Sequence, residues 1–382
     1  MNYTRGDSMR FEINKDKLLY HLLIAQKALS NKTPNPALQG VKLDVEKDAL
    51  VITTSNAEIS IKIVVEDASL SVESEGSVLI PGKYFIEIIR KLDGQMVHVS
   101  HVEDNLIRIE ADHSDITLNV LELDDYPNLV FKEKDESVKI NVRTLKTVIR
   151  QTAFSTSTIE NRPILTGVHL QIDGKTLTAV ATDSYRLSRK TITLDAEYDP
   201  MNVIIPGKSL EELMKILENN QEDVTVHFDQ SRVLFKYANV SFLSRLLEGN
   251  YPETERLIPQ EFPVKITFNK EALMLAIERA SLLSKHDSHN AIVKMTLRQD
   301  DTVTIASNSP EIGRVLEEIH PVDEVVGSPI KIAFSSRYVL EALKSFASSE
   351  VAISFTGETR PFVMTGEFDE AMLQLVLPVK TD

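Results

Sequence analysis

Hydrophobic and polar positions along this chain follow a pattern that occurs more than once. Val203 to Leu217 reads VIIPGKSLEELMKIL and Val78 to Leu92 reads VLIPGKYFIEIIRKL, so that Pro81 and Pro206 stand 125 residues apart. Each copy begins with a short apolar run and continues, after Pro-Gly, with apolar residues spaced as on one face of a helix, which predicts a strand leading directly into a helix. Proline is tolerated at or near the first helical position because its missing N–H has no partner there. Two such junctions at a fixed offset indicate an internal repeat.

A second landmark predicts three copies of the repeat. Asn14, Asn141 and Asn269 each follow a short strand-like run and precede a helix-period pattern. Asparagine is a favoured helix N-cap because its side-chain oxygen accepts a free backbone N–H of the first turn. The third copy of the opening element reads IAFSSRYVLEALKSF and has lost its Pro-Gly. The pattern therefore predicts three pairs of helices.

A polar turn recurs at the same spacing as these helices. The segment ITTSNAEISI, centred on Ser55, aligns with VATDSYRLSR around Asp183 and with IASNSPEIGR around Asn308. Because Ser, Asp and Asn all favour turns, Asp183 is interpreted as a turn residue rather than a catalytic one.

Each repeat reads strand, helix, several strands, a second helix and three more strands. The late strands alternate, as in Ile107 with Ile109 and Leu373 with Leu375, which is typical of half-buried antiparallel sheet. The predicted fold class is α+β, with two helices packed on antiparallel sheets in each domain. Polar or proline-bearing segments place the domains at residues 1–136, 137–260 and 261–382, with residues 1–8 as an extension.

Composition narrows the function. The 382 residues include no cysteine, which excludes disulfides, thiol nucleophiles and thiolate metal sites. The nine histidines lack metal-ligand spacing, and the sequence contains no glycine-rich phosphate loop or nucleophile elbow. An enzyme is therefore not favoured, and we expect no cofactor and no metal. No apolar run reaches the length of a membrane span or a signal core, so we expect a cytoplasmic protein.

The net charge argues against a nucleic-acid partner, whereas the positions of the basic residues favour one. A net charge of −15 argues against unaided, tight binding to nucleic acid. On the helix after Asn141, however, the basic residues lie opposite the apolar face, and the second helices carry cations seven residues apart, on one face. For any single lysine a solvated helix face is the better explanation, but the recurrence favours a selected position. Glu87, Glu211 and Glu341 show that these faces are not purely basic. The cations concerned are Lys83, Arg90, Arg143, Lys146, Arg150, Lys208, Lys215, Arg337 and Lys344.

Geometry limits how such helices could surround duplex DNA. A unit of this size has an equivalent diameter of about 35 Å, so rings of three, four and six units leave holes of about 5, 15 and 35 Å. A B-form duplex is roughly 20 Å across. A head-to-tail dimer of three-unit chains is thus the smallest closed ring of whole copies that admits it. Encirclement needs no strong contact, which reconciles the acidic total with a DNA partner.

Several long blocks, in order, carry a resemblance to a known family. RPILTGV begins at Arg162, ATDSYRLS at Ala181, SRLLEGNYP at Ser244 and LQLVLPV at Leu373. With them the sequence resembles the bacterial DNA polymerase III beta subunit family, the sliding clamps, over essentially its full length from Met9. The resemblance implies three repeated clamp domains, a homodimeric ring of six domains around double-stranded DNA, tethering of the replicative DNA polymerase, and loading by an ATP-driven clamp loader.

The same resemblance implies a peptide-binding pocket between the second and third domains, used by proteins with a clamp-binding motif. Its apolar residues would form the pocket, and arginine at its rim would bind polar groups of the peptide. Taken singly, each apolar residue would be read as ordinary core. Tyr185 stands where many relatives have histidine, and Pro361 where a small polar residue is frequent. The residues carried over are Leu165, Thr182, Tyr185, Arg186, Leu187, Pro252, Arg256, Leu257, Tyr338, Pro361, Leu377, Pro378 and Val379.

The resemblance also places a subunit interface. Leu282 and Leu283 of the third domain would face the strand near Ile116 of the first domain in a second copy, and ring closure would pair an edge strand. The loop His286 to Asn290 has no confident counterpart. The alternative to a clamp is a non-enzymatic scaffold of three repeats that never encircles DNA.

Overall fold

The computed structural model describes residues 9–380 apart from residues 31, 32, 34, 104, 160, 219, 221 and 285–290. The N-terminal extension and the loop His286 to Asn290 therefore lie outside the described residues. The chain forms two compact units, one of Met1–Val142 with Glu212–Leu246 and one of Arg143–Glu211 with Leu247–Asp382.

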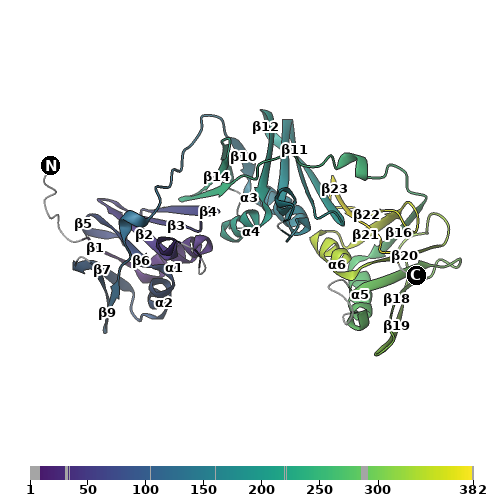
Figure 1. Cartoon of the computed structure of the whole chain (residues 1–382), viewed down its shortest axis with the longest axis horizontal. Coiled ribbons are helices and arrows are strands. Elements are labelled where there is room, and N and C mark those ends of the chain that lie inside the picture. The colour runs from purple at the N-terminus through teal and green to yellow at the C-terminus, as the bar shows by residue number, and fades with distance from the viewer. Residues whose placement is uncertain are drawn as a thin grey trace. The chain divides into compact units, whose positions relative to one another are not determined.

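The first unit contains two antiparallel sheets. The smaller has the strand order β5 (Ser71–Ser74), β1 (Arg10–Asn14), β7 (Met96–Glu103), β8 (Leu106–Ala111) and β9 (Ser114–Asn119). The larger has the order β10 (Val138–Asn141), β13 (Asp223–Phe228), β14 (Arg232–Tyr237), β15 (Val240–Arg245), β4 (Ile59–Val65), β3 (Ala49–Ser55), β2 (Gly40–Glu46) and β6 (Gly76–Pro81). Helices α1 (Lys15–Ala25) and α2 (Gly82–Lys91) lie side by side against these sheets (Figure 1).

The second unit has the same plan. One sheet has the order β11 (Gly167–Thr182), β12 (Arg186–Pro206), β23 (Met372–Val376), β22 (Phe362–Gly366), β21 (Glu350–Phe355) and β16 (Val264–Asn269). The other has the order β19 (Gly313–Ile319), β18 (Val303–Ser309), β17 (Ile292–Leu297) and β20 (Ile330–Ser335). Helices α5 (Lys270–Ser284) and α6 (Ser336–Ser345) pack against each other, and buried side chains such as Leu273, Ile277 and Leu343 fill the core between helices and sheets.

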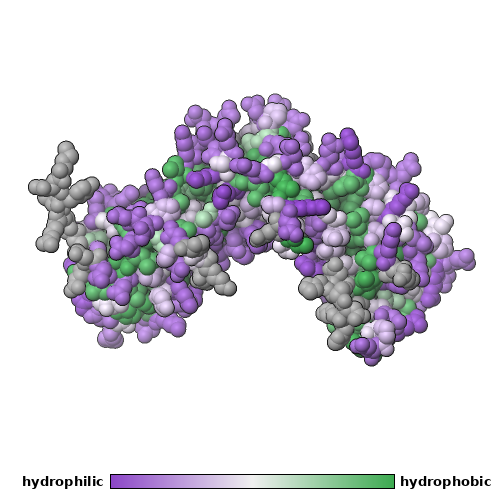
Figure 2. Space-filling view, viewed as in Figure 1, coloured by the Kyte–Doolittle hydropathy of each residue, from purple (hydrophilic) through white to green (hydrophobic). Residues whose placement is uncertain are grey.

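The order of elements confirms the predicted repeat. Strand, helix, strands, helix and three strands occur three times among the described residues, and the long strands β11 and β12 replace several shorter ones in the second copy. Two further helices, α3 (Val142–Thr152) and α4 (Gly207–Ile216), belong to that copy. The helices put apolar side chains inward, and Figure 2 shows hydrophilic side chains over most of the visible surface.

Hydrogen bonds confirm two of the predicted N-caps. The side chain of Asn14 accepts hydrogen bonds from the N–H groups of Asp16 and Lys17, and Asn269 Oδ1 accepts from Ala272 N at 3.0 Å. Each bond satisfies an N–H that has no partner within the helix.

Close packing explains the glycine of the repeated Pro-Gly. A Cβ atom at Gly82 would lie 2.7 Å from Leu29 Cδ1, and one at Gly207 would lie 2.7 Å from Thr156 Oγ1. Both distances are shorter than non-bonded atoms tolerate. In the third copy a buried serine, Ser336, occupies this position, so the requirement for glycine is local to the first two copies.

The turn role of Asp183 is confirmed, but its predicted equivalence with Ser55 is wrong by one residue. Asp183 Oδ1 accepts from the N–H groups two and three residues on, and Asn56 Oδ1 does the same in the first repeat. The next residues, Ala57 and Ser184, have φ of 76° and 77°. Ser55 instead matches Thr182, because each hydroxyl bonds the carbonyl four residues later.

Strand pairing crosses the expected domain borders within each unit. In the first unit β15 pairs with β4, and in the second β12 pairs with β23, with Leu187 opposite Leu375. Each unit therefore has one sheet whose strands come from two sequence repeats.

Candidate functional site

The peptide site carried over from the resemblance lies in the second unit and has an apolar floor. Val180 and Leu187, on β11 and β12, form one buried cluster with Val363 and Leu375, on β22 and β23. Partly buried side chains pack against it, namely Tyr251, Ile258, Phe262 and Leu373. Because β12 and β23 are hydrogen-bonded neighbours, residues from two sequence repeats meet in one sheet.

A tight turn positions the next part of the site. Thr182 Oγ1 donates to the carbonyl of Arg186 at 2.6 Å, and Asp183 Oδ1 accepts from the N–H groups of Tyr185 and Arg186 at 2.9 and 3.0 Å. This geometry leaves Tyr185 59% exposed, with its ring stacked on that of Tyr338 at a centroid distance of 6.4 Å. The two tyrosines therefore form one aromatic surface beside the floor.

The C-terminal segment is hydrogen-bonded to the same turn. Leu377 N donates to Tyr185 O at 2.9 Å, and Val379 N donates to Ala333 O at 2.8 Å. Leu377, Pro378 and Val379 are all half-buried. They supply accessible apolar surface at the edge of the site.

Arg186 is buried rather than placed at a rim. It is 4% exposed, its Nε donates to Asp183 Oδ2 at 3.0 Å, and its other nitrogens donate to Glu341 and to the carbonyl of Phe154. The expectation of a rim arginine that binds polar groups of a peptide does not fit Arg186. Arg256 meets that condition, because its side chain is 84% exposed and pairs at 3.1 Å with Glu253, which is 73% exposed.

Three more carried-over residues are next in the chain to residues or strands of this site. Pro252 is exposed and follows Tyr251, whose hydroxyl accepts from Thr182 N at 3.1 Å. Leu257 is 54% exposed in the short helix η6 (Glu255–Leu257), next to the floor residue Ile258. Pro361 precedes β22 and is half-buried.

Leu165 is buried and is hydrogen-bonded to the segment that follows α3. It is buried in η5 (Pro163–Thr166), and its carbonyl accepts from Ser157 N at 2.8 Å. These contacts account for Leu165 as a core residue, which is how an isolated apolar residue is ordinarily read.

Sequence reasoning missed the partners of Arg186 and most of the floor. Glu341 lies on α6, 155 residues away in the chain, and no motif links it to Arg186. Val180, Val363 and Leu375 lie in ordinary alternating strand patterns, which do not distinguish a binding-site residue from a core residue. Only Asp183 carried a specific signal, through its place in the recurring turn.

The predicted basic residues are accessible on their helices. On α3, Arg143 and Arg150 are exposed and Lys146 is half-buried, while Leu145 and Val148 are buried, so the basic stripe faces away from the core. The remaining predicted cations, Lys83, Arg90, Lys208, Lys215, Arg337 and Lys344, are all exposed.

Several of these cations have a glutamate partner nearby. Arg90 pairs with Glu87, Lys215 with Glu212 at 2.6 Å, Arg337 with Glu341 at 3.0 Å and Lys344 with Glu278 at 3.9 Å. Exposed pairs of this kind contribute only about 0.2–1 kcal/mol each, so a phosphate can replace the glutamate at small cost.

The predicted interface residues lie on the edge strand β9 and on helix α5, which packs against β19. Ile116 is half-buried on β9. Among the described strands, β9 pairs with β8 alone and β19 with β18 alone, so both are edge strands. Leu282 on α5 is 60% exposed and Leu283 is half-buried. Leu316, 49% exposed on β19, was missed although its strand alternates.

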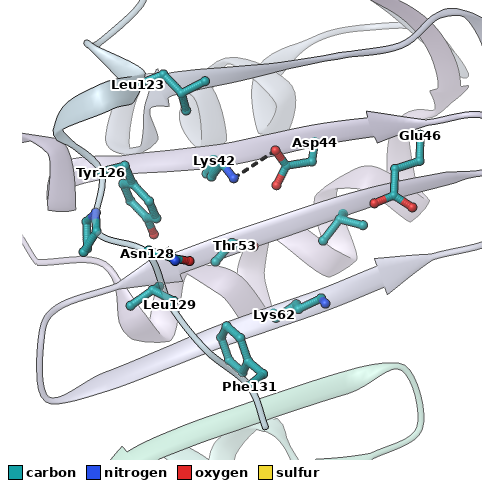
Figure 3. Close-up of a pocket in the computed structure, with 12 residues that line it drawn as sticks. Lys42, Asp44, Glu46, Thr53, Lys62, Leu123, Tyr126, Asn128, Leu129 and Phe131 are labelled. Carbon is teal, nitrogen blue, oxygen red and sulfur yellow. Dashed lines mark ion pairs between the residues drawn. The ribbon is translucent and has the colours of Figure 1, made fainter.

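The first unit has a cavity of its own. It measures about 440 Å³ and lies between the segment Leu123 to Phe131 and the face of β2, β3 and β4 (Figure 3). Lys42 and Asp44 form an ion pair of 3.0 Å on its wall. The hydroxyl of Tyr126 is buried there without a hydrogen-bond partner among the described residues, and burial, with Asp44 adding to it, raises the pKa of Tyr126.

Within the described part of the chain, no three acidic or histidine side chains form a group suited to a metal ion. The helices described there are also too short or too polar to span a membrane.

Comparison with known proteins gives consistent similarities over the whole chain. Models of the N-terminal, central and C-terminal domains of the DNA polymerase III beta subunit match residues 9–130, 139–253 and 255–380. The Beta sliding clamp of Staphylococcus aureus is 40% identical over an alignment of 379 residues that covers 98% of this chain and 100% of the relative. That of Staphylococcus epidermidis is 39% identical over 378 residues, again 98% and 100% of the two chains.

Solved structures agree with these relatives. The DNA polymerase sliding clamp from Bacillus subtilis superimposes with a TM-score of 0.94 at 40% identity, and the DNA polymerase III beta chain from Streptococcus pneumoniae with 0.94 at 37%. Both alignments cover 98% of this chain and 100% of the other.

Proposed function

The chain belongs to the DNA polymerase III beta subunit family, and from that premise we propose that it works as a homodimeric ring, opened by a clamp loader, around double-stranded DNA. Its role is that of a DNA sliding clamp, a processivity factor rather than a catalyst. The observation that carries this conclusion is that three domain models match the chain in order. It is supported by 40% identity to a relative that is covered over its full length. We place the protein in the cytoplasm, and the function requires no cofactor.

The helices support sequence-independent contact with DNA. Exposed cations occur at corresponding places on α2, α4 and α6, and the stripe on α3 adds two exposed arginines and the half-buried Lys146. Phosphates are read without regard to base sequence, which suits a ring that slides. With a net charge of −15, encirclement rather than affinity would hold the protein on DNA.

The peptide site supports binding of partner proteins. An extended segment with apolar side chains would lie over the floor formed by Leu187 and its neighbours, against Tyr185, Tyr338 and Leu377. Arg256 would bind its polar groups. The partners proposed are the replicative DNA polymerase, the clamp loader and other proteins with a clamp-binding motif.

The sheet ends support ring closure. Edge strands are normally paired or protected, and pairing of β9 with β19 of a second copy would satisfy both edges. The apolar side chains of Leu282 and Leu316 would be buried by the same contact. Because the two surfaces are different, head-to-tail contacts close a ring with a second identical junction.

Topology gives the decisive experiment. The protein is loaded on a nicked circular plasmid with a clamp loader, washed in high salt, and followed before and after the circle is cut once. A sliding clamp stays on the circle through the wash and leaves after linearisation. Retention on neither form would favour the scaffold alternative, and salt-sensitive retention on both would indicate ordinary surface binding.

A further inference from the structure

The guanidinium of Arg186 joins three segments that are far apart in the sequence. Its Nε donates to Asp183 in the turn, one terminal nitrogen donates to Glu341 on α6, and the other donates to the carbonyl of Phe154 just after α3. Arginine is suited to this because its planar group offers five donors in a fixed arrangement. The segments come from two sequence repeats but lie in one compact unit.

Aromatic rings complete the surroundings of Arg186. Its guanidinium carbon lies 4.7 Å from the ring centroid of Tyr338 and 5.3 Å from that of Phe154. Cations at such distances are attracted to the ring face, most strongly when water is excluded. At 4% exposure, Arg186 is largely removed from water.

These contacts fix both tyrosines of the peptide site. Tyr338 is held by the cation beside it, and Tyr185 belongs to the turn whose Asp183 receives the Arg186 Nε–H. The two rings then stack with an angle of 17° between their planes. Glu341 is itself held, because its second oxygen accepts from Arg337 at 3.0 Å.

We propose that Arg186 is a positioning residue of the peptide site, which holds Tyr185 and Tyr338 in place for the peptide and does not touch the peptide itself. The proposal rests on the proposed function for the nature of the ligand. Its geometric basis is that the three donating nitrogens of Arg186 point to Asp183, Glu341 and Phe154. Arg256, with its exposed side chain, is the contrasting residue that would touch the peptide.

The test uses two fluorescein-labelled peptides that differ in one atom group. Each contains two leucines and a phenylalanine, and one carries an aspartate where the other carries an asparagine. Their affinities are measured by fluorescence anisotropy for the full-length wild-type protein and for Arg186→Ala, Arg186→Lys, Glu341→Gln and Arg256→Ala. Glu87→Gln is the matched control, since Glu87 also pairs with an arginine on its helix, and that arginine, Arg90, is exposed.

A positioning role predicts the same loss for both peptides. If Arg186→Ala populates the ordered site about one-tenth of the time, both dissociation constants rise about tenfold. Arg186→Lys and Glu341→Gln shift both constants in the same direction by less, and Glu87→Gln leaves them unchanged. Addition of guanidinium chloride at millimolar concentration to Arg186→Ala restores affinity in part, whereas sodium chloride at the same concentration does not. Arg256→Ala weakens the aspartate peptide more than its twin.

Two outcomes would overturn the proposal. One is a loss in the Arg186 variants that is confined to the aspartate peptide, because that shows direct contact. The other is an unchanged affinity. Amide hydrogen exchange without peptide provides an independent measurement, in which residues 182–187 and the first turn of α6 exchange faster in Arg186→Lys than in wild type. If the wild type binds neither peptide, the peptide part of the proposed function fails, and the exchange rates still decide whether Arg186 orders this region.

Discussion

Tyr126-Pro127 and Tyr251-Pro252 stand 125 residues apart in two repeats, yet the hydroxyl groups of the two tyrosines have different surroundings. The hydroxyl of Tyr251 accepts from Thr182 N at 3.1 Å, and its ring stacks on His169 at 4.9 Å. In the first repeat the Tyr126 hydroxyl is buried without a hydrogen-bond partner among the described residues. The nearby Lys42 and Asp44 pair with each other. The tyrosine hydroxyl is therefore hydrogen-bonded in one repeat and faces a cavity in the other.

Removal of the two hydroxyls should have different effects. Tyr251→Phe leaves Thr182 N–H without its acceptor and should lower the free energy of unfolding by about 1 kcal/mol. Tyr126→Phe removes no hydrogen bond and should leave that free energy unchanged or raise it by up to about 1 kcal/mol. Urea unfolding of each variant beside the wild type measures the difference. Equal losses in both variants would show that the Tyr126 hydroxyl has a partner in solution.

Histidines with lowered pKa values should make stability depend on pH. Burial lowers the pKa of His21 on α1, against the opposing effect of Asp67 and with a small contribution from Lys17. Burial likewise lowers the pKa of His169, against its hydrogen bond to Asn202. A group whose pKa is lower in the folded state binds more protons when unfolded, so its stabilising effect is complete above about pH 6.5 and is lost as the pH falls below that value.

The urea midpoint of the wild type should therefore fall as the pH is lowered from about 7.5 to about 5.5, a window that spans the ordinary histidine pKa. In His21→Gln the fall should be smaller, because glutamine does not titrate, and in His21→Gln with His169→Gln smaller still. A midpoint with the same pH dependence in wild type and double variant would mean that neither histidine is protected from protonation in the folded state.

At the scale of elements, the helices were predictable and the contacts between them were not. N-caps and apolar spacing are local, so Asn14 and the buried face of α3 could be identified from sequence. Asn56, and not Ser55, is the counterpart of Asp183. Serine and asparagine are both common in turns, so residue type could not distinguish the two alignments. Only hydrogen bonds reveal the correct one. The burial of Arg186 depends on Glu341, which is distant in the chain.

The stripe on α3 makes a testable prediction for DNA binding. Replacement of Arg143, Lys146 and Arg150 by glutamine removes three positive charges from a face directed away from the core. Loading on nicked circles at low salt should then weaken. The salt dependence of loading should become shallower by about one unit of log–log slope for each phosphate that is no longer neutralised.

A matched control separates position from net charge. Lys175, Lys265 and Lys331 are exposed on strands, and their replacement by glutamine makes the same change in charge. This control should load as the wild type does. Sedimentation should show the wild-type assembly for both triple variants, and dissociation of the α3 variant would mean that the stripe belongs to an interface between subunits.

At the scale of the whole molecule, the proposed assembly depends on the edges of the sheets. At the borders between repeats, β15 pairs with β4 and β12 pairs with β23, so these strands have hydrogen-bonded neighbours there. The edges of β9 and β19 have no such partner strand in the described part of the chain. β9 and β19 lie in the first and third repeats, so in the proposed ring of six repeats each pairs with the other edge strand of a second copy.

Disruption of this junction should open the ring. Leu282→Asp with Leu283→Asp places two carboxylates where the proposed interface is apolar, and burial of unpaired charges is costly. Sedimentation should show monomers, and retention on circular DNA should be lost. Leu257→Asp is the control, because Leu257 is similarly exposed, at 54% against 60% for Leu282, but lies at the peptide site. It should remain dimeric in sedimentation while losing peptide affinity, so that ring closure and partner binding are tested separately. A dimer unaffected by the double substitution would place the subunit interface elsewhere.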